Sequence, residues 1–213
     1  MVQCSVWSGF LTQGKIWPQQ GEINIIEYVN LATSNQYALY AGQAPCSQPT
    51  TVNQTGHTSS ANCTAPPVGC TVIESQPEAF GQVFANNNGG VYAMLLNDDG
   101  ISMWFFTRQS IPSDISAVGN NPNPSGWGIP SAFYPASGCD PTVVFGPQII
   151  TLVRLPLSFL LYYTDSRAVG SILPSVELWQ VHRVSSRRLA AMLLRIVYLL
   201  LLTLIITTTH IGT

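Results

Sequence analysis

Two glutamates that lie five residues apart are the side chains of this sequence best suited to acid–base chemistry. Residues 21–27 read GEINIIE, so Glu22 and Glu27 flank Asn24. Paired carboxylates can divide the work, one attacking an electrophilic carbon while the other supplies a proton. Trp17 precedes the pair and Trp7 lies further upstream, and such rings cover the apolar faces of sugars. These residue types favour glycosidase chemistry, and the competing interpretation is an ordinary solvated strand.

The spacing of the two acids sets a condition on the strand that carries them. Side chains alternate between the faces of a regular strand, so Glu22 and Asn24 would share one face while Glu27 fell on the isoleucine side. One extra residue at Ile25-Ile26, a β-bulge, would return Glu27 to the face of Glu22. We therefore predict a bulge there, with the carboxyl groups roughly 5–5.5 Å apart, the separation typical of a retaining glycosidase.

The elements around this strand predict an all-β domain, with a sandwich favoured over a barrel. Of the 213 residues, 46% are hydrophobic, enough for one sizeable core. We see no convincing helix before residue 150, and the turn formers at 97–100, NDDG, predict a hairpin. Residues 42–70 and 110–135 are expected to be loops. Strands are expected in 4–17, 21–27, 33–40, 82–84, 90–96 and 101–107.

Charge divides the chain into two segments. Residues 1–150 carry eight acids against two basic residues, whereas residues 151–213 carry six arginines against two acids. The acidic first segment has no basic patch and no glycine-rich phosphate loop, which argues against binding of nucleic acid or nucleotides. We expect residues 1–150 to form the sandwich and residues 151–213 to form a divergent tail.

The tail contains a long apolar segment, residues 189–206. Arg195 and Thr203 interrupt it, and its eighteen residues are about the length of a membrane span. If it spans a membrane, the basic residues 183–188 lie on the cytoplasmic side. Because Gly, Asn and Cys nearly vanish after residue 150, an aberrant reading frame or a retained intron is the alternative origin. A packed helix is the third interpretation.

The cysteines and two short motifs indicate an oxidising compartment. All five cysteines precede residue 150 without C-x-x-C spacing, so a disulfide framework with one unpaired member is favoured over a zinc site. Asn53-Gln-Thr55 and Asn62-Cys-Thr64 match the N-glycosylation pattern. Because Met1 to Cys4 lack a signal sequence, we expect an upstream segment to be missing. The cysteines are Cys4, Cys46, Cys63, Cys70 and Cys139.

Residues 17–30, WPQQGEINIIEYVN, resemble the active-site signature of glycoside hydrolase family 16, W-P-x-x-G-E-I-D-I-I-E-x-V-N. The resemblance is to the fungal endo-1,3(4)-β-glucanase, laminarinase-like branch, and it covers about residues 4–150. It implies a concanavalin-like β-jelly-roll sandwich with a concave glucan-binding cleft. Further matching segments are CSVW at 4–7, SNQ at 34–36, NC at 62–63, GC at 69–70, FANNNGGVYA at 84–93, WFFTR at 104–108, IPSDI at 111–115, WG at 127–128 and CD at 139–140.

The resemblance also implies roles for single residues. Glu22 would be the nucleophile, Glu27 the general acid/base, and Trp17 and Trp7 the sugar platform. The reaction would be the retaining hydrolysis of β-1,3 or mixed β-1,3-1,4 glucans, with no cofactor or metal. The family's setting is extracellular, and a membrane anchor through residues 189–206 is the alternative.

Several positions depart from the family pattern. Asn24 stands where the family has an active-site Asp, Tyr40 where it commonly has a His, and Leu95-Leu96 where it has Glu-Trp. Family strands before Cys4 and after residue 150 are expected to be missing, so the sandwich would be incomplete and Cys139 would lose its disulfide partner. The alternatives to an active enzyme are therefore a catalytically impaired glucan-binding remnant and a non-functional truncated gene product.

Overall fold

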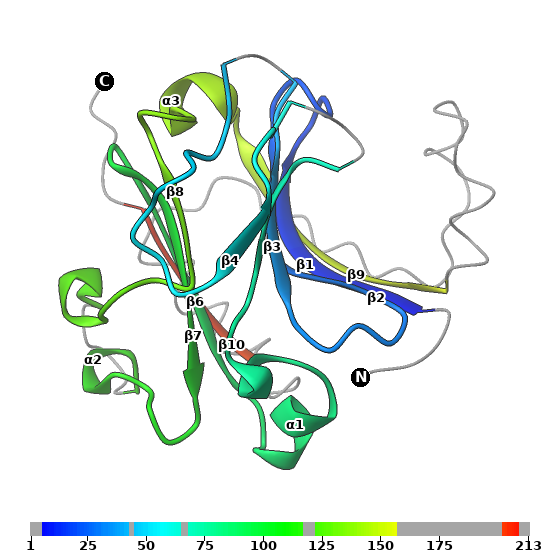
Figure 1. The fold of residues 1–213 in the computed structure, drawn as a ribbon, viewed down its shortest axis with the longest axis vertical. Helices are drawn as coiled ribbons and strands as arrows, with labels where there is room; N and C mark the ends of the chain where they lie inside the picture. Colours follow the sequence, from blue (N-terminus) through cyan, green and yellow to red (C-terminus); the bar gives the residue numbers. More distant parts are fainter. Residues whose placement is uncertain (1–5, 43–44, 65–67, 117–121, 157–201, 209–213) are drawn as a thin grey trace.

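Two antiparallel β-sheets lie face to face in this protein (Figure 1). The structure is a computed structural model that describes residues 6–42, 45–64, 68–116, 122–156 and 202–208. The first sheet has the strand order β4-β5-β3-β2-β1-β9, and the second has the order β10-β6-β7-β8, in which only β10 pairs in parallel. The strands are β1 Val6–Gly14, β2 Glu22–Val29, β3 Gln36–Tyr40, β4 His57–Ser60, β5 Cys70–Ile73, β6 Gly90–Asn97, β7 Gly100–Thr107, β8 Ala132–Pro135, β9 Gln148–Pro156 and β10 Leu202–Thr208.

The core lies between the sheets. It is built from the side chains that each strand, with its alternating faces, directs toward the other sheet. β3 turns Tyr37 and Leu39 inward, and β2 turns Ile23 and Ile25 inward, all fully buried. β6 and β7 contribute the facing layer, in which the rings of Tyr92 and Phe105 lie 5.0 Å apart. Burial of alternate large side chains on both inner faces is what stabilises a jelly-roll sandwich. The predicted fold class is confirmed.

The hairpin predicted at residues 97–100 joins β6 to β7. Asn97 pairs with Gly100, which leaves Asp98 and Asp99 as the two-residue loop. The Asn97 side chain accepts a hydrogen bond from the backbone N–H of Asp99, at 3.1 Å. Gly100 has a φ of 135°, which side-chain-bearing residues rarely adopt.

The secondary structure predicted from the sequence was wrong in several segments, and short helices occur before residue 150 where none was expected. Residues 82–84, expected as a strand, lie in the helix α1, Gly81–Asn86, which ends where Asn88 and Gly89 take positive φ. The expected loop 42–70 contains β4, and the expected loop 110–135 contains β8, because tertiary pairing fixes strands with weak local patterns. The remaining short helices are α2 Ser113–Ser116, α3 Pro141–Val144, η1 Pro77–Ala79 and η2 Pro124–Gly126.

The segment boundary expected at residue 150 falls inside a strand. β9 runs through it and pairs with β1 along its whole length, from Gly14 opposite Gln148 to Val6 opposite Pro156. Of the apolar segment 189–206, residues 189–201 lie outside the described residues. Residues 202–206 belong to β10 rather than to a helix, since this stretch is rich in β-branched Thr and Ile. Among the described residues, no helix has the length and apolar character needed to cross a membrane.

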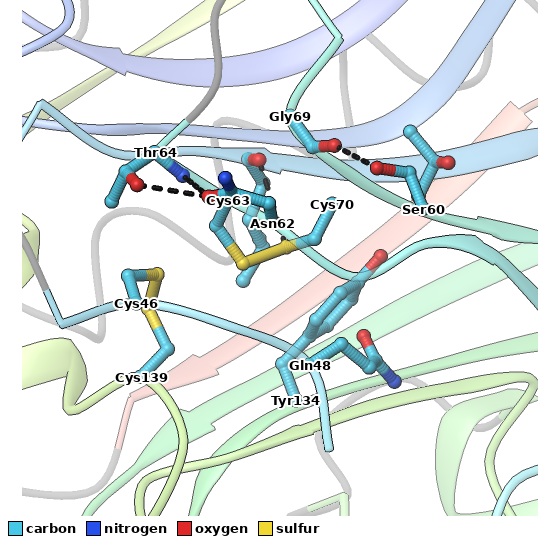
Figure 2. Close-up of a disulfide and its surroundings, with 12 residues drawn as sticks. Cys46, Gln48, Ser60, Asn62, Cys63, Thr64, Gly69, Cys70, Tyr134 and Cys139 are labelled. Atoms are coloured by element: carbon cyan, nitrogen blue, oxygen red, sulfur yellow. Dashed lines mark hydrogen bonds between the residues drawn. A yellow bond between two sulfur atoms is a disulfide. The ribbon is translucent and has the colours of Figure 1, made fainter. Parts of the chain in front are cut away.

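Two disulfides lie next to each other (Figure 2). Cys63 pairs with Cys70 across a short loop, and Cys46 pairs with Cys139 across a separation of 93 residues. The expectation that Cys139 lacks a partner is therefore wrong. Next to the Cys46–Cys139 bond, the Ser47 N–H donates to the Gly138 carbonyl at 2.9 Å. This hydrogen bond joins the two chain segments that carry the paired cysteines. Cys4 lies outside the described residues.

Candidate active site

The predicted bulge is present in β2. On the β3 side Asn24 pairs with Ala38 and Glu27 with Gln36, so the ladder skips a residue between them. On the β1 side Asn24 and Ile26 pair with neighbouring residues, Leu11 and Phe10, which leaves Ile25 unmatched in both ladders. As a result Ile25 is buried and Ile26 packs against the same core. Glu27 is returned to the outer face that carries Glu22 and Asn24.

Glu22 lies within a set of hydrogen-bond donors. The amide of Gln13, its neighbour on β1, donates to Oε2 at 2.8 Å, and Asn24 Nδ2 donates to Oε1 at 2.8 Å. The Trp17 indole also donates to this carboxyl group. Burial raises the pKa of Glu22 above its ordinary value, while these three hydrogen bonds act in the opposite direction because they stabilise the ionised form.

Glu27 is more buried, with 8% of its surface exposed. Burial, and after it the negative charge of Glu22, raise the pKa of Glu27 to about 7. Gln36 Nε2 donates to Glu27 Oε2 at 3.5 Å, and Tyr40 also donates to this carboxyl group. The two acids thus have different environments, so that near neutral pH Glu27 keeps its proton more readily than Glu22 does.

An open cleft of about 460 Å³ runs over the first sheet beside Glu27. Trp7 on β1, Gln36 and Tyr40 on β3, and the hydroxyl-bearing Thr71 on β5 line it, so residues predicted for sugar binding meet Glu27 there. The outer wall is formed by Ser59 and Ser60 of β4 and by Val68 of the loop closed by the Cys63–Cys70 disulfide. The cleft therefore combines two aromatic rings with hydroxyl and amide groups, the mixture that a sugar chain requires.

Trp17 lies at the Glu22 end of the outer face. It remains 44% exposed, and its ring centroid is 6.4 Å from that of Tyr40. The start of β2 next to it is tightly packed: Gly21 has a φ of 73°, and a Cβ there would clash with the Phe145 ring. The structure therefore brings Trp17, Tyr40 and Glu22 together, and Trp7 and Tyr40 share the cleft with Glu27.

The only group of three candidate metal ligands within the described residues is Cys46, Cys63 and Cys139. All three are buried and engaged in the two disulfides, so they are not available as thiolate ligands (Figure 2). The acids of the candidate site do not form such a group with any other described side chain.

Sequence reasoning missed three residues that support the acids. Gln13 and Gln36 are the cross-strand neighbours of Glu22 and Glu27, and only the pairing register identifies them. Asn35 contacts the backbone of the bulge and lies immediately before β3. The segment 34–36 had been singled out for its resemblance, but no local pattern shows that an amide before one strand binds the backbone of another.

Comparison with known proteins agrees with this architecture. A family model described as the XgeA-like catalytic GH16 domain matches residues 1–155. An endo-1,3(4)-β-glucanase of Arthroderma benhamiae is 38% identical over 144 residues, which are 64% of this chain and 31% of that protein. A probable glycosidase of Schizosaccharomyces pombe is 38% identical over 152 residues, 69% of this chain and 36% of its own length. This chain thus spans about a third of these relatives.

Solved structures give the same result. Laminarinase 16A from Phanerochaete chrysosporium, with β-glucans in its donor and acceptor sites, superposes with a TM-score of 0.67 at 33% identity. The match covers 72% of this chain and 53% of the laminarinase. A β-sandwich that presents two glutamates beside an open cleft has the architecture of a glycoside hydrolase domain. The chain belongs to glycoside hydrolase family 16.

Proposed function

We propose that this chain hydrolyses β-1,3 or mixed β-1,3-1,4 glucans with retention of configuration. The observation that supports the proposal most strongly is the bulge, because it brings Glu27 to the same face as Glu22 and next to the cleft. The substrate class comes from the relatives, which are named as endo-1,3(4)-β-glucanases, and from the laminarinase with bound β-glucan. We expect an extracellular site of action, as for a family member acting on a polymer.

In the first step Glu22 is the nucleophile and Glu27 the acid. The Glu22 carboxylate attacks the anomeric carbon and forms a glycosyl ester, while the leaving oxygen takes the Glu27 proton. Three donors favour the ionised form of Glu22 against the effect of burial, whereas burial and the neighbouring charge both favour the protonated form of Glu27. In the second step the Glu27 carboxylate removes a proton from water, the water oxygen attacks the same carbon, and the ester bond to Glu22 breaks.

The aromatic side chains supply the sugar contacts in this proposal. Trp17, exposed beside Glu22, and Trp7, in the cleft beside Glu27, offer ring faces for pyranose rings. The Tyr40 ring lies near that of Trp17, and Tyr40 shares the cleft with Trp7 and donates to Glu27. Asn24 contributes a hydrogen bond to the nucleophile rather than a proton, since an amide does not ionise.

The test is the release of reducing sugar from laminarin by the whole chain, followed by NMR of the first product. We expect a β-configured reducing end and loss of the activity in Glu22→Gln. A product that initially has the α configuration, or equal activity of Glu22→Gln, would contradict the mechanism. The same assay with mixed β-1,3-1,4 glucan separates the two candidate linkages.

A second candidate function is glucan binding without hydrolysis, and Asn24 is the observation that favours it. This amide is buried, with 1% of its surface exposed, and occupies the position between the acids without a titratable proton. Binding of laminarin without sugar release, together with hydrolysis appearing in Asn24→Asp, would support this candidate. If wild type hydrolyses laminarin, the binding-only candidate is excluded, and a further rise in Asn24→Asp would show that the amide limits the rate.

A further inference from the structure

We infer that Asn35 is a positioning residue that holds the β2 bulge in shape and thereby keeps Glu27 on the face of Glu22, an inference that rests on the proposed function. Asn35 is fully buried and is not among the residues that line the cleft. It therefore cannot act by touching a bound glucan, and its effect must pass through the strand that it contacts.

The contacts of Asn35 span the bulge. Its Nδ2 donates to the Ile25 carbonyl at 2.9 Å, and its Oδ1 accepts from the Glu27 N–H at 3.2 Å. Ile25 is the residue that neither neighbouring strand matches, so the ladder offers the bulge fewer partners than a regular strand would have. One amide thus replaces the missing sheet contacts at both ends of the irregularity.

Asn35 is itself fixed in place. Its backbone carbonyl accepts from the Glu74 N–H at 2.9 Å, just beyond the end of β5. The Glu74 side chain is buried too, and accepts from the Tyr37 hydroxyl at 2.7 Å. The bulge is therefore held from the side of β3 and β5 by a chain of buried hydrogen bonds, which reduces the freedom of Glu27 to move.

The geometry explains why this position matters for catalysis. Without the two amide contacts, the strand can relax toward regular alternation, which would turn Glu27 toward the core side and away from Glu22. A displacement of about 1 Å in a reacting group can cost about 10²-fold in rate. The titratable groups that interact electrostatically with Glu27 are Glu22 on its own strand, Tyr40 on β3 and, from the core, Tyr134 on β8.

The experiment compares Asn35→Ala with a matched control, Gln48→Ala. Gln48 is also a buried amide, donating to the Phe133 carbonyl at 2.9 Å, but it lies outside the cleft. We expect both variants to lose thermal stability, and only Asn35→Ala to lose about 10²-fold in kcat with KM changed less than about threefold. A folded Asn35→Ala with the kcat of wild type would overturn the inference, as would an equal loss in Gln48→Ala.

A second readout does not depend on turnover. We would follow the Glu27 carboxyl carbon by NMR, assigned with Glu27→Gln, as the pH is raised. The midpoint should lie near 7 in wild type and in Gln48→Ala, and higher in Asn35→Ala, because Glu27 turned toward the core is more completely buried and loses the Gln36 and Tyr40 donors, and these changes outweigh its separation from Glu22. An unchanged midpoint in Asn35→Ala would contradict the positioning role of Asn35. If wild type releases no sugar, the proposed function fails while this titration still decides on Asn35.

Asn35→Asp is a conservative variant. It tests the positioning role of Asn35 if Asn35→Ala does not fold. When protonated, the new acid can donate to the Ile25 carbonyl and accept from the Glu27 N–H as the amide does. When ionised, it repels that carbonyl. We expect near wild-type kcat at low pH and a steeper loss than in wild type as the pH rises. A kcat profile identical to that of wild type across this range would overturn the inference.

Discussion

Within the part of the chain that the structure describes, two regions combine tryptophan with a carboxylate, and one of them has the features of a reactive site. On the first sheet, Trp17 donates to Glu22 beside the cleft. On the outer face of the second sheet, Trp127 Nε1 donates to both oxygens of Asp114, at 3.2 and 3.0 Å. The residue types are similar, so the difference in chemistry must come from the surroundings.

In the Asp114 region the tryptophan is buried and the carboxylate serves as its hydrogen-bond acceptor. Trp127 is 7% exposed and packs edge-on against Trp104 at 5.3 Å, in a small core that also contains Phe106. The Asn123 N–H and then the Trp127 indole lower the pKa of Asp114, since both bonds stabilise the ionised form. Asp114 is therefore held as a hydrogen-bond acceptor that closes a loop.

The Glu22–Glu27 region has the opposite properties. Its aromatic ring is exposed, its two acids influence each other, and burial raises the pKa of Glu27 to about 7. A carboxylate next to a tryptophan is thus not in itself a signal of catalysis. The informative features are a second acid on the same face and an open space beside it.

The largest contrast should appear when the acids themselves are changed. Glu27→Gln removes the proton donor without changing the shape, so we expect kcat on laminarin to fall by about 10³–10⁴-fold. Asp114→Asn should stay within about twofold of wild type, measured as initial rates of reducing-sugar release. Comparable losses in both variants would remove the distinction between the two regions.

Substitution of the two tryptophans should affect the free energy of unfolding more in the Asp114 region than in the Glu22–Glu27 region. Trp127→Ala empties a packed site, so we expect it to lower the free energy of unfolding by about 3–5 kcal/mol, measured by denaturant titration. Trp17→Ala truncates an exposed ring and should cost less than about 1 kcal/mol. If the two substitutions destabilise the protein equally, the Trp17 ring is part of a core and not of a binding surface.

Glucan affinity should depend on the Trp17 ring. Trp17→Ala is expected to weaken laminarin binding by about 1–2 kcal/mol, roughly tenfold in Kd, measured by calorimetry on the Glu22→Gln background. Trp17→Phe keeps a ring face but loses the N–H donor, so its Kd should stay closer to wild type. Equal weakening by Ala and Phe would assign the effect to the hydrogen bond instead.

The smallest effect should come from Tyr40. Its hydroxyl donates to Glu27 and lowers the pKa of that acid, so Tyr40→Phe should raise the pKa above about 7. Glu27 must be protonated in the first step, so the basic limb of the kcat/KM profile should move to higher pH by less than about 1 unit. A shift to lower pH would show that Tyr40 acts on Glu27 in some other way.

Part of this site could be predicted from the sequence because its information is local. The alternation in residues 21–27 required a bulge if both glutamates were to share a face, and the register of β2 against β3 confirms it. The partners of the acids are not local. Gln13, Gln36 and Asn35 acquire their contacts from strand pairing and from a bond to the bulge, and no spacing rule connects them to Glu22 or Glu27.

The same reasoning explains the errors in the fold. The short strands β4 and β8 lie in polar or proline-rich sequence, and they exist because β5 and β7 offer free edges for pairing. The Cys46–Cys139 bond joins residues whose proximity depends on the completed sandwich. Long-range pairing of this kind overrides weak local secondary-structure preferences, and it cannot be detected in a short window of sequence.

The pairing of β1 with β9 bears on how the molecule folds. Gly14 lies opposite Gln148, and Gln148 Nε2 also donates to the Gln20 carbonyl at 2.8 Å, close to the start of the strand that carries Glu22. Contacts between residues so distant along the chain form slowly, because a large loop must close first. In refolding experiments we therefore expect enzymatic activity to appear in the slowest phase, together with the last tertiary signal and after the 97–100 hairpin.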